Sequence, residues 1–186
     1  MKTIDKRMLW FLDVFVFILA LLLDQITKSI ARKSLAVGEA ADVIPGVFQF
    51  LHVENKGASW GMFQGGSVVF IILAFIVSIG LTVFISRIPG KTRFIRLHLS
   101  LSLIIAGAIG NVIDRIQKGS VTDFFYAQFI NFPVFNVADI FIVCSTAWLM
   151  IMILFIYKDE ELDFMGGNKK KSKTSEKDKK SGKEEK

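Results

Sequence analysis

The sequence predicts an all-α membrane protein with four transmembrane helices. Hydrophobic residues make up 52% of the 186 residues, and 18 residues are phenylalanine, which is unusual for a soluble domain. Four apolar stretches occur along the chain, and each is long enough to cross a hydrocarbon layer of about 30 Å. They cover approximately residues 8–30, 68–86, 97–116 and 137–157.

Positive charge is concentrated at the carboxyl end. Residues 167–186 hold nine lysines and four acidic residues, so they carry nearly all of the net charge of +6. A basic face on a folded domain is therefore not expected, and neither is a nucleic-acid partner. The segment 166–186 is rich in lysine and serine without apolar periodicity, which predicts a disordered tail after a folded domain of residues 1–165.

The first apolar stretch is expected to be a retained helix. It is longer than the apolar core of an ordinary signal peptide, and no convincing cleavage site follows it. Asp13, near its start, is expected at the membrane interface. Asp24 and Lys28, near its end, are four residues apart and share one helix face. Two interpretations stay open: an interfacial ion pair with the Lys28 ammonium extended to water, or a pair that serves a functional site.

The segment 34–66 is too long for a plain loop. Its residues 47–53 are rich in β-branched and aromatic side chains and follow Pro45 and Gly46, which predicts an extended hairpin or a small sheet. The sequence around Asn55 and Gly57 suits a tight turn. That turn is either purely structural or part of a substrate-facing loop.

The third apolar stretch ends in a polar group. Asn111 precedes Asp114 by three residues and Arg115 by four, so the three side chains lie on one side of the helix end. Polar and ionisable side chains at membrane depth are costly and usually functional. Earlier in the same helix, small residues offer a surface for close helix packing. These are Ala106, Gly107 and Gly110.

The sequence shows no metal-binding pattern. Its two histidines, His52 and His98, are far apart and form no zinc motif. The single cysteine, Cys144, excludes an internal disulfide and a cysteine-rich metal site, and we expect it to be a small packing residue in the fourth helix. We therefore expect no metal and no other cofactor.

The distribution of basic residues predicts the orientation of the four helices. The amino terminus, the turn at 87–96 and the tail are basic, whereas the connections 34–66 and 117–135 are close to neutral. By the positive-inside rule the basic segments, and so both termini, are cytoplasmic. Polar residues from separate segments then gather at the outer end of the helices. They are Asp24, Asn55, Asn111, Arg115, Asp123, Asn136 and Asp139.

Asp123 and Asp139 are candidate catalytic carboxylates. Two carboxyl groups in one site do not both ionise easily, so one keeps a proton near neutral pH. The ionised group would take a proton from water, and the protonated group would polarise a carbonyl and supply a proton to a leaving amine. The alternative is structural: Asn136 caps the fourth helix, Asp139 is the acid of its first turn, and Asp123 is an ordinary loop residue.

Two other classes of membrane protein were weighed against an enzyme. A proton or ion carrier would spread its ionisable groups through the membrane depth, whereas these groups cluster at one end and the second stretch has none. A non-catalytic interaction protein would not require a pair of acids. Neither class explains the gathered polar residues as well as a hydrolytic site does.

Five short motifs occur in order along the four helices. They are Asp24-Gln-x-Thr-Lys28, Asn55-x-Gly57-Ala58, Gly107-Ala-Ile-Gly-Asn-x-Ile-Asp-Arg115, Val121-x-Asp-Phe124 and Phe135-Asn-x-Ala-Asp139. Together they resemble the lipoprotein signal peptidase (signal peptidase II) family of bacterial membrane aspartic peptidases. The resemblance runs over nearly all of residues 8–157.

The resemblance implies an endopeptidase that removes the signal peptide from diacylglyceryl-modified prolipoproteins, cutting before the lipidated cysteine. It implies a location in the bacterial cell (cytoplasmic) membrane, with the site near the outer face. The expected partners are the lipidated precursor and membrane lipid, without a cofactor and without a required oligomer. Two aspartates, Asp123 and Asp139, match the catalytic pair that activates a water.

The resemblance also assigns supporting positions and two extracytoplasmic elements. The supporting residues are Asp24, Lys28, Asn55, Gly57, Asn111, Asp114, Arg115, Asn136 and Ala138. A β-cradle is expected within 34–66, and a short surface helix is expected around 122–131. The lysine-rich tail departs from most relatives, and its role stays open.

Overall fold

The computed structural model describes residues 2–57 and 67–165, so Ala58 of the second motif and the tail predicted at 166–186 lie outside the described residues. The chain divides into two compact units, Met1–Met150 and Ile151–Lys186. The four main helices are α1 (Lys6–Ser34), α2 (Ser67–Arg87), α3 (Ile95–Lys118) and α4 (Val137–Ile151). A π-helical turn, Met152–Ile156, and a 3-10 helix, Asp159–Met165, belong to the second unit.

Within residues 2–57 and 67–165, four helical segments are long and apolar enough to cross a membrane, which confirms the prediction of four membrane-spanning helices. Hydropathy marks only the apolar part of a helix, and α1, α2 and α3 each continue into polar residues beyond the predicted stretch. With 29 residues at 1.5 Å each, α1 is about 43 Å long, which exceeds the hydrocarbon thickness of about 30 Å. Its polar last turns therefore reach the membrane boundary.

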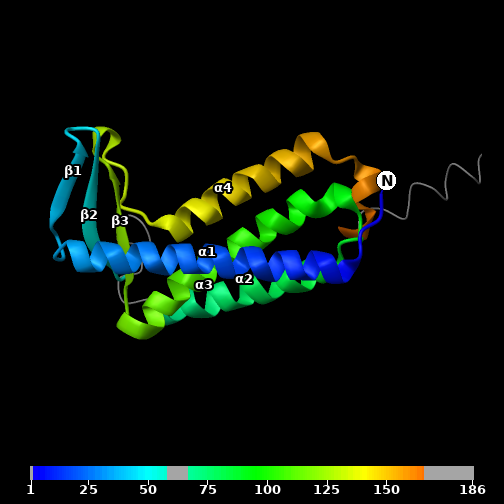
Figure 1. Cartoon of the computed structure of the whole chain (residues 1–186), viewed down its shortest axis with the longest axis horizontal. Coiled ribbons are helices and arrows are strands. Elements are labelled where there is room, and N and C mark those ends of the chain that lie inside the picture. The colour runs from blue at the N-terminus through cyan, green and yellow to red at the C-terminus, as the bar shows by residue number, and fades with distance from the viewer. Residues whose placement is uncertain (1, 58–66, 166–186) are drawn as a thin grey trace, which may run out of the picture. The chain divides into compact units, whose positions relative to one another are not determined.

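A small antiparallel sheet follows α1 and lies at the end of the helices opposite to the amino terminus (Figure 1). Strands β1 (Ala40–Ile44) and β2 (Phe48–Asn55) form the predicted hairpin, and β3 (Val121–Ala127) pairs with β2. Pro45 and Gly46 make the turn: Gly46 has φ of 74°, and Val47 N–H donates to the Ile44 carbonyl at 2.9 Å. Glycine suits this position because positive φ costs it little.

The surface helix expected around 122–131 is limited to a 3-10 turn at Gln128–Ile130. Most of that region forms β3 instead, because its β-branched and aromatic side chains favour a strand and β2 offers a free edge. In the β2–β3 register Val53 lies opposite Asp123, and Glu54 lies opposite Thr122. Asp123 is therefore on a strand, and its description as a loop residue is wrong.

Small residues of α3 allow close contact with two neighbouring helices, as predicted. A Cβ at Gly107 would lie 2.5 Å from the Ala138 carbonyl oxygen and 2.8 Å from the Ile142 side chain, both in α4. A Cβ at Gly110 would collide with the Asp24 carboxylate of α1. Side chains at these two positions would push α1 and α4 away from α3.

Two expectations for the helices are wrong. Asp13 is not at the interface but buried between α1 and α3: its carboxylate lies 2.8 Å from His98 Nδ1 and accepts a 3.0 Å hydrogen bond from Ser102 Oγ. Cys144 is exposed on α4 rather than packed. Sequence alone does not reveal which face of an almost uniformly apolar helix meets its neighbours.

Candidate active site

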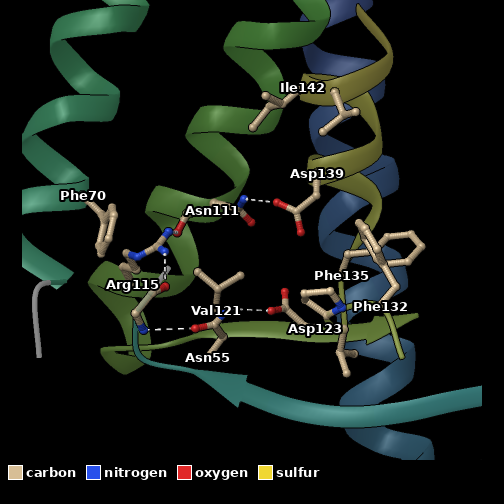
Figure 2. A pocket seen from close by; sticks show the side chains of 14 residues that line it. Asn55, Phe70, Asn111, Arg115, Val121, Asp123, Phe132, Phe135, Asp139 and Ile142 are labelled. Carbon is tan, nitrogen blue, oxygen red and sulfur yellow. Dashed lines mark hydrogen bonds between the residues drawn. The ribbon is translucent and has the colours of Figure 1, made fainter. Parts of the chain in front are cut away.

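Asp123 of β3 and Asp139 in the first turn of α4 line one cavity of about 310 Å³. Figure 2 shows the two carboxylates directed into the same space from opposite sides. Polar and aromatic side chains complete the wall, among them Asn55, Asn111, Arg115, Phe70 and Phe135. The structure thus brings together the two acids that sequence analysis paired.

Asn136 connects the two carboxylates. Its Nδ2 donates to Asp123 Oδ1 at 2.6 Å, and its backbone N–H donates to Asp139 Oδ2 at 3.0 Å. Its Oδ1 accepts in return from the Asp139 N–H at 3.0 Å, which completes a reciprocal cap at the start of α4. The capping geometry is therefore present, and it coexists with the paired acids instead of replacing them.

Two further amides hold one carboxylate each (Figure 2). Asn55 Nδ2 donates to Asp123 Oδ2 at 2.9 Å, and Asn111 Nδ2 donates to Asp139 Oδ1 at 2.9 Å. The oxygen of each amide accepts from another donor: Asn55 Oδ1 from the Gly57 N–H at 3.0 Å, and Asn111 Oδ1 from Lys28 Nζ at 2.8 Å. These contacts orient both amides with their NH₂ groups toward the acids.

Lys28 lies at the centre of a buried ionic cluster next to the cavity. Its Nζ is 3.0 Å from Asp24 Oδ2 and 3.3 Å from Asp114 Oδ2, and all three side chains are 0% exposed. The snorkelling interpretation of Lys28 is therefore wrong. The helical spacing of the pair is correct, but α3 covers it and supplies a second acid.

The two acids of this cluster anchor the backbone beside the candidate catalytic residues. Asp24 Oδ1 accepts from the Ala138 N–H at 3.0 Å, one residue before Asp139. Asp114 Oδ2 accepts from the Thr122 N–H at 3.2 Å, one residue before Asp123. The Lys28 cluster thus fixes α4 and β3 at the two places from which the carboxylates project.

Arg115 supplies a positive charge to the cavity wall. Its guanidinium donates to the Gly57 carbonyl at 3.3 Å and to the Asn111 carbonyl at 3.4 Å, and it lies 5.0 Å from the centre of the Phe70 ring. These contacts connect α3 to α2 and to the end of β2, and they keep the charge beside both carboxylates. Every described supporting residue predicted from the sequence therefore lies in or next to this one site.

Burial raises the pKa of Asp123 to about 7, and the nearby Asp139 carboxylate adds to the shift. The hydrogen bonds from Asn55 and Asn136 stabilise the ionised form and oppose the shift only in part. Asp123 therefore holds a proton at neutral pH for a substantial fraction of the time, which is the state that a two-carboxylate hydrolytic site requires.

A family model described as signal peptidase (SPase) II matches residues 16–155, which is most of the chain. The chain belongs to the signal peptidase II family. The lipoprotein signal peptidase of Clostridium novyi is 36% identical over 146 residues, covering 77% of this chain and 97% of that protein. The Microcystis aeruginosa protein of the same name is 42% identical over 147 residues, covering 78% of this chain and 92% of its own.

Solved structures of bacterial membrane enzymes resemble this member of the signal peptidase II family. One has a TM-score of 0.70 at 28% identity, covering 86% of this chain and 93% of its own. Another has a TM-score of 0.68 at 30% identity, covering 78% and 94%. The predicted fold class, four membrane-spanning helices with a small sheet, is confirmed.

The sequence analysis did not predict a second polar cluster, which joins β2 to the start of β3. Glu54 accepts from Ser120 Oγ at 2.6 Å, from Thr122 Oγ1 at 3.0 Å and from His52 Nε2 at 3.1 Å. Arg32 of α1 donates to Thr122 Oγ1 at 3.1 Å. The available signal was the period of two in β2, which puts His52 and Glu54 on one face of the strand.

Proposed function

We propose that the chain is a membrane aspartic endopeptidase that removes the signal peptide from diacylglyceryl-modified prolipoproteins, cutting before the lipidated cysteine. Family membership implies a peptidase, and the relatives named above are lipoprotein signal peptidases. The single observation that supports the aspartic mechanism is the pair Asp123 and Asp139 in one cavity, each held by amide groups. The test is cleavage of a purified lipidated precursor by the purified protein.

In the proposed reaction Asp139 is the base and Asp123 carries the proton. Asp139 lies at the positive end of the α4 dipole, which favours its ionised form, whereas burial favours a protonated Asp123. Asp139 takes a proton from water as the water oxygen attacks the scissile carbonyl, and Asp123 donates its proton to the carbonyl oxygen. Asp139, which now holds the water proton, protonates the leaving amine in place of the initially protonated acid expected from the sequence. Asp123 recovers its proton from the hydroxyl group of the intermediate as the carbon–nitrogen bond breaks.

The proposed location is the bacterial cell membrane, with both termini cytoplasmic and the site near the outer face. Two observations support it. The basic residues are in the connections at one end of the helices, and the sheet, whose strand β3 carries Asp123 of the cavity wall, is at the end opposite to the amino terminus (Figure 1). Residues 166–186 are proposed to be cytoplasmic. One chain supplies both carboxylates and their amide partners, so the proposal requires no oligomer.

Reporter fusions check this orientation. A reporter fused after Gly90, in the basic turn between α2 and α3, is expected inside the cell, and one fused after Val121 is expected outside. The reason is that α3 crosses the membrane between the two points. Activity of both reporters on the same side of the membrane would contradict the proposed arrangement.

Cleavage is expected to depend on lipidation of the precursor. An acyl-anchored cysteine is held at the bilayer surface, next to a site at the outer helix ends, so the scissile bond is positioned before the reaction starts. An unlipidated precursor loses this positioning, and we expect kcat/KM to fall by about 100-fold or more. Equal cleavage of lipidated and unlipidated precursor by the same preparation would refute the proposed substrate.

Activity is expected to fall as pH rises through about 7. A raised pKa means that the Asp123 proton is present below that pH and is lost above it. Loss of this proton removes the group that polarises the scissile carbonyl. The dependence of kcat/KM on pH, measured with a precursor that carries no titrating side chain near the scissile bond, should show this alkaline decline. A flat profile across neutral pH would argue against Asp123 as the proton donor.

A further inference from the structure

His52 of β2 is a buried histidine with a hydrogen-bond partner at each ring nitrogen. Its Nδ1 lies 2.9 Å from the carbonyl oxygen of Leu35, the residue that ends α1. Its Nε2 lies 3.1 Å from Oε1 of Glu54. The ring therefore connects the end of α1 to β2, whose last residue, Asn55, lines the candidate catalytic cavity.

Both partners of the ring are acceptors. A backbone carbonyl has no hydrogen to donate. Glu54 is a carboxylate near neutral pH: burial opposes ionisation, but hydrogen bonds from Ser120, His52 and Thr122, with the charge of Lys118, hold its pKa below the ordinary value. Two good hydrogen bonds to two acceptors require a hydrogen on each ring nitrogen, which only the imidazolium form has.

The immediate partners of the ring favour a positive charge, whereas two nearby cations oppose it. Leu35 lies at the carboxyl end of α1, where the helix dipole favours a cation. The charged groups around the cluster are Glu54 itself, Arg32 of α1, and Asp114 and Lys118 of α3. Both cations contact Thr122 Oγ1, and Asp114 lies 3.5 Å from Arg32 and accepts from the Thr122 N–H. Because Thr122 Oγ1 accepts from these two cations, its own hydrogen is free to point to Glu54.

The Glu54 carboxylate in turn holds the start of β3. It accepts from Ser120 and Thr122, and Thr122 directly precedes Asp123. The residue after Glu54 is Asn55, whose amide donates to Asp123. The orientation of Glu54 therefore affects both the strand that carries Asp123 and the amide that holds it.

We propose that His52 is a positioning residue, held as an imidazolium between Leu35 and Glu54, that keeps β2 and β3 in the arrangement that orients Asp123. The expected effect of His52 on the cleavage rate rests on the proposed function. The expected protonation of both ring nitrogens does not depend on any activity. In this proposal His52 contacts neither the substrate nor the attacking water. Replacing it should therefore slow the chemical step and leave substrate binding unchanged.

The first measurement is nuclear magnetic resonance of the full chain in detergent at neutral pH, with ¹⁵N-labelled histidine. The chain has two histidines, and the signals absent from a His52→Gln sample are those of His52. We expect both His52 ring nitrogens to be protonated in the wild type. In Glu54→Gln the ring loses its anionic acceptor and is expected to become neutral. A neutral His52 in the wild type overturns the inference.

The second measurement compares cleavage of lipidated precursor by wild type, His52→Gln, Glu54→Gln and the control Asp42→Asn. Asp42 is an exposed acid of β1 in the same sheet, so its variant removes a carboxylate outside the cluster. We expect kcat to fall by about 10- to 100-fold in the two cluster variants with KM nearly unchanged, and both constants to stay at wild-type values in Asp42→Asn. Wild-type kcat in Glu54→Gln overturns the positioning role. A wild type that cuts no lipidated precursor overturns the proposed function itself.

Discussion

Asp123→Asn and Asp139→Asn are each expected to abolish cleavage, with kcat reduced by about 10⁴-fold or more. Asparagine has nearly the shape of aspartate, but it neither accepts a proton as a base nor returns one as an acid. The two carboxylates share one cavity and one connecting residue, Asn136, so neither can complete the reaction alone. The measurement is single-turnover cleavage of lipidated precursor.

The double variant separates a catalytic pair from two independent residues. Groups that act as one unit are strongly non-additive, so Asp123→Asn/Asp139→Asn should be no slower than either single variant. Stability is the control: Asp139→Asn keeps an oxygen for the Asn136 N–H and should cost about 0.3–1 kcal/mol. Substantial turnover by either single variant would return Asp139 to a purely capping role.

Lys28→Met is expected to lower the free energy of unfolding by about 3–5 kcal/mol. The change removes the cation between Asp24 and Asp114, so the fully buried Asp24 carboxylate loses its ion pair and Asp114 keeps the more distant one, with Arg32 at 3.5 Å. Asn111 also loses the shorter of the two hydrogen bonds to Oδ1 that orient its amide toward Asp139. Any folded fraction should therefore cleave slowly as well.

The matched control is Lys33→Met, five residues further along α1, where the side chain is exposed. That change should alter stability by no more than about 0.5 kcal/mol. The free energy of unfolding of the two variants would be measured in mixed micelles that contain increasing amounts of a denaturing detergent. Equal stability of the two variants would mean that the buried cluster contributes nothing to the fold.

Hydropathy and motif order were sufficient to predict the helices and the pairing of Asp123 with Asp139. They were insufficient for Lys28, because helical spacing places it beside Asp24 but does not show that Asn111 and Asp114 of α3 cover both. Burial here depends on residues more than 80 positions away in the sequence.

The capping and the catalytic interpretations of Asn136 and Asp139 are compatible, because a carboxylate has two oxygens and each can accept more than one hydrogen bond. One Asp139 oxygen closes the helix cap, and the other binds Asn111. The cluster around Glu54 was missed because β3, which carries its partner Thr122, was not predicted as a strand. The catalytic roles themselves stay predictions.

The polar contacts between α1 and α3 have a mechanical consequence. Asp13 contacts His98 in one half of the pair, and Lys28 contacts Asn111 in the other. These points are separated by about 22 Å along α1 and about 20 Å along α3, from 1.5 Å per residue, so they match in two helices that run in the same direction. Sliding one helix by a turn of about 5.4 Å would break both contacts together. The two helices therefore form a stiff unit that resists sliding, and the Asp24 and Asp114 carboxylates join the start of α4 and the start of β3 to it.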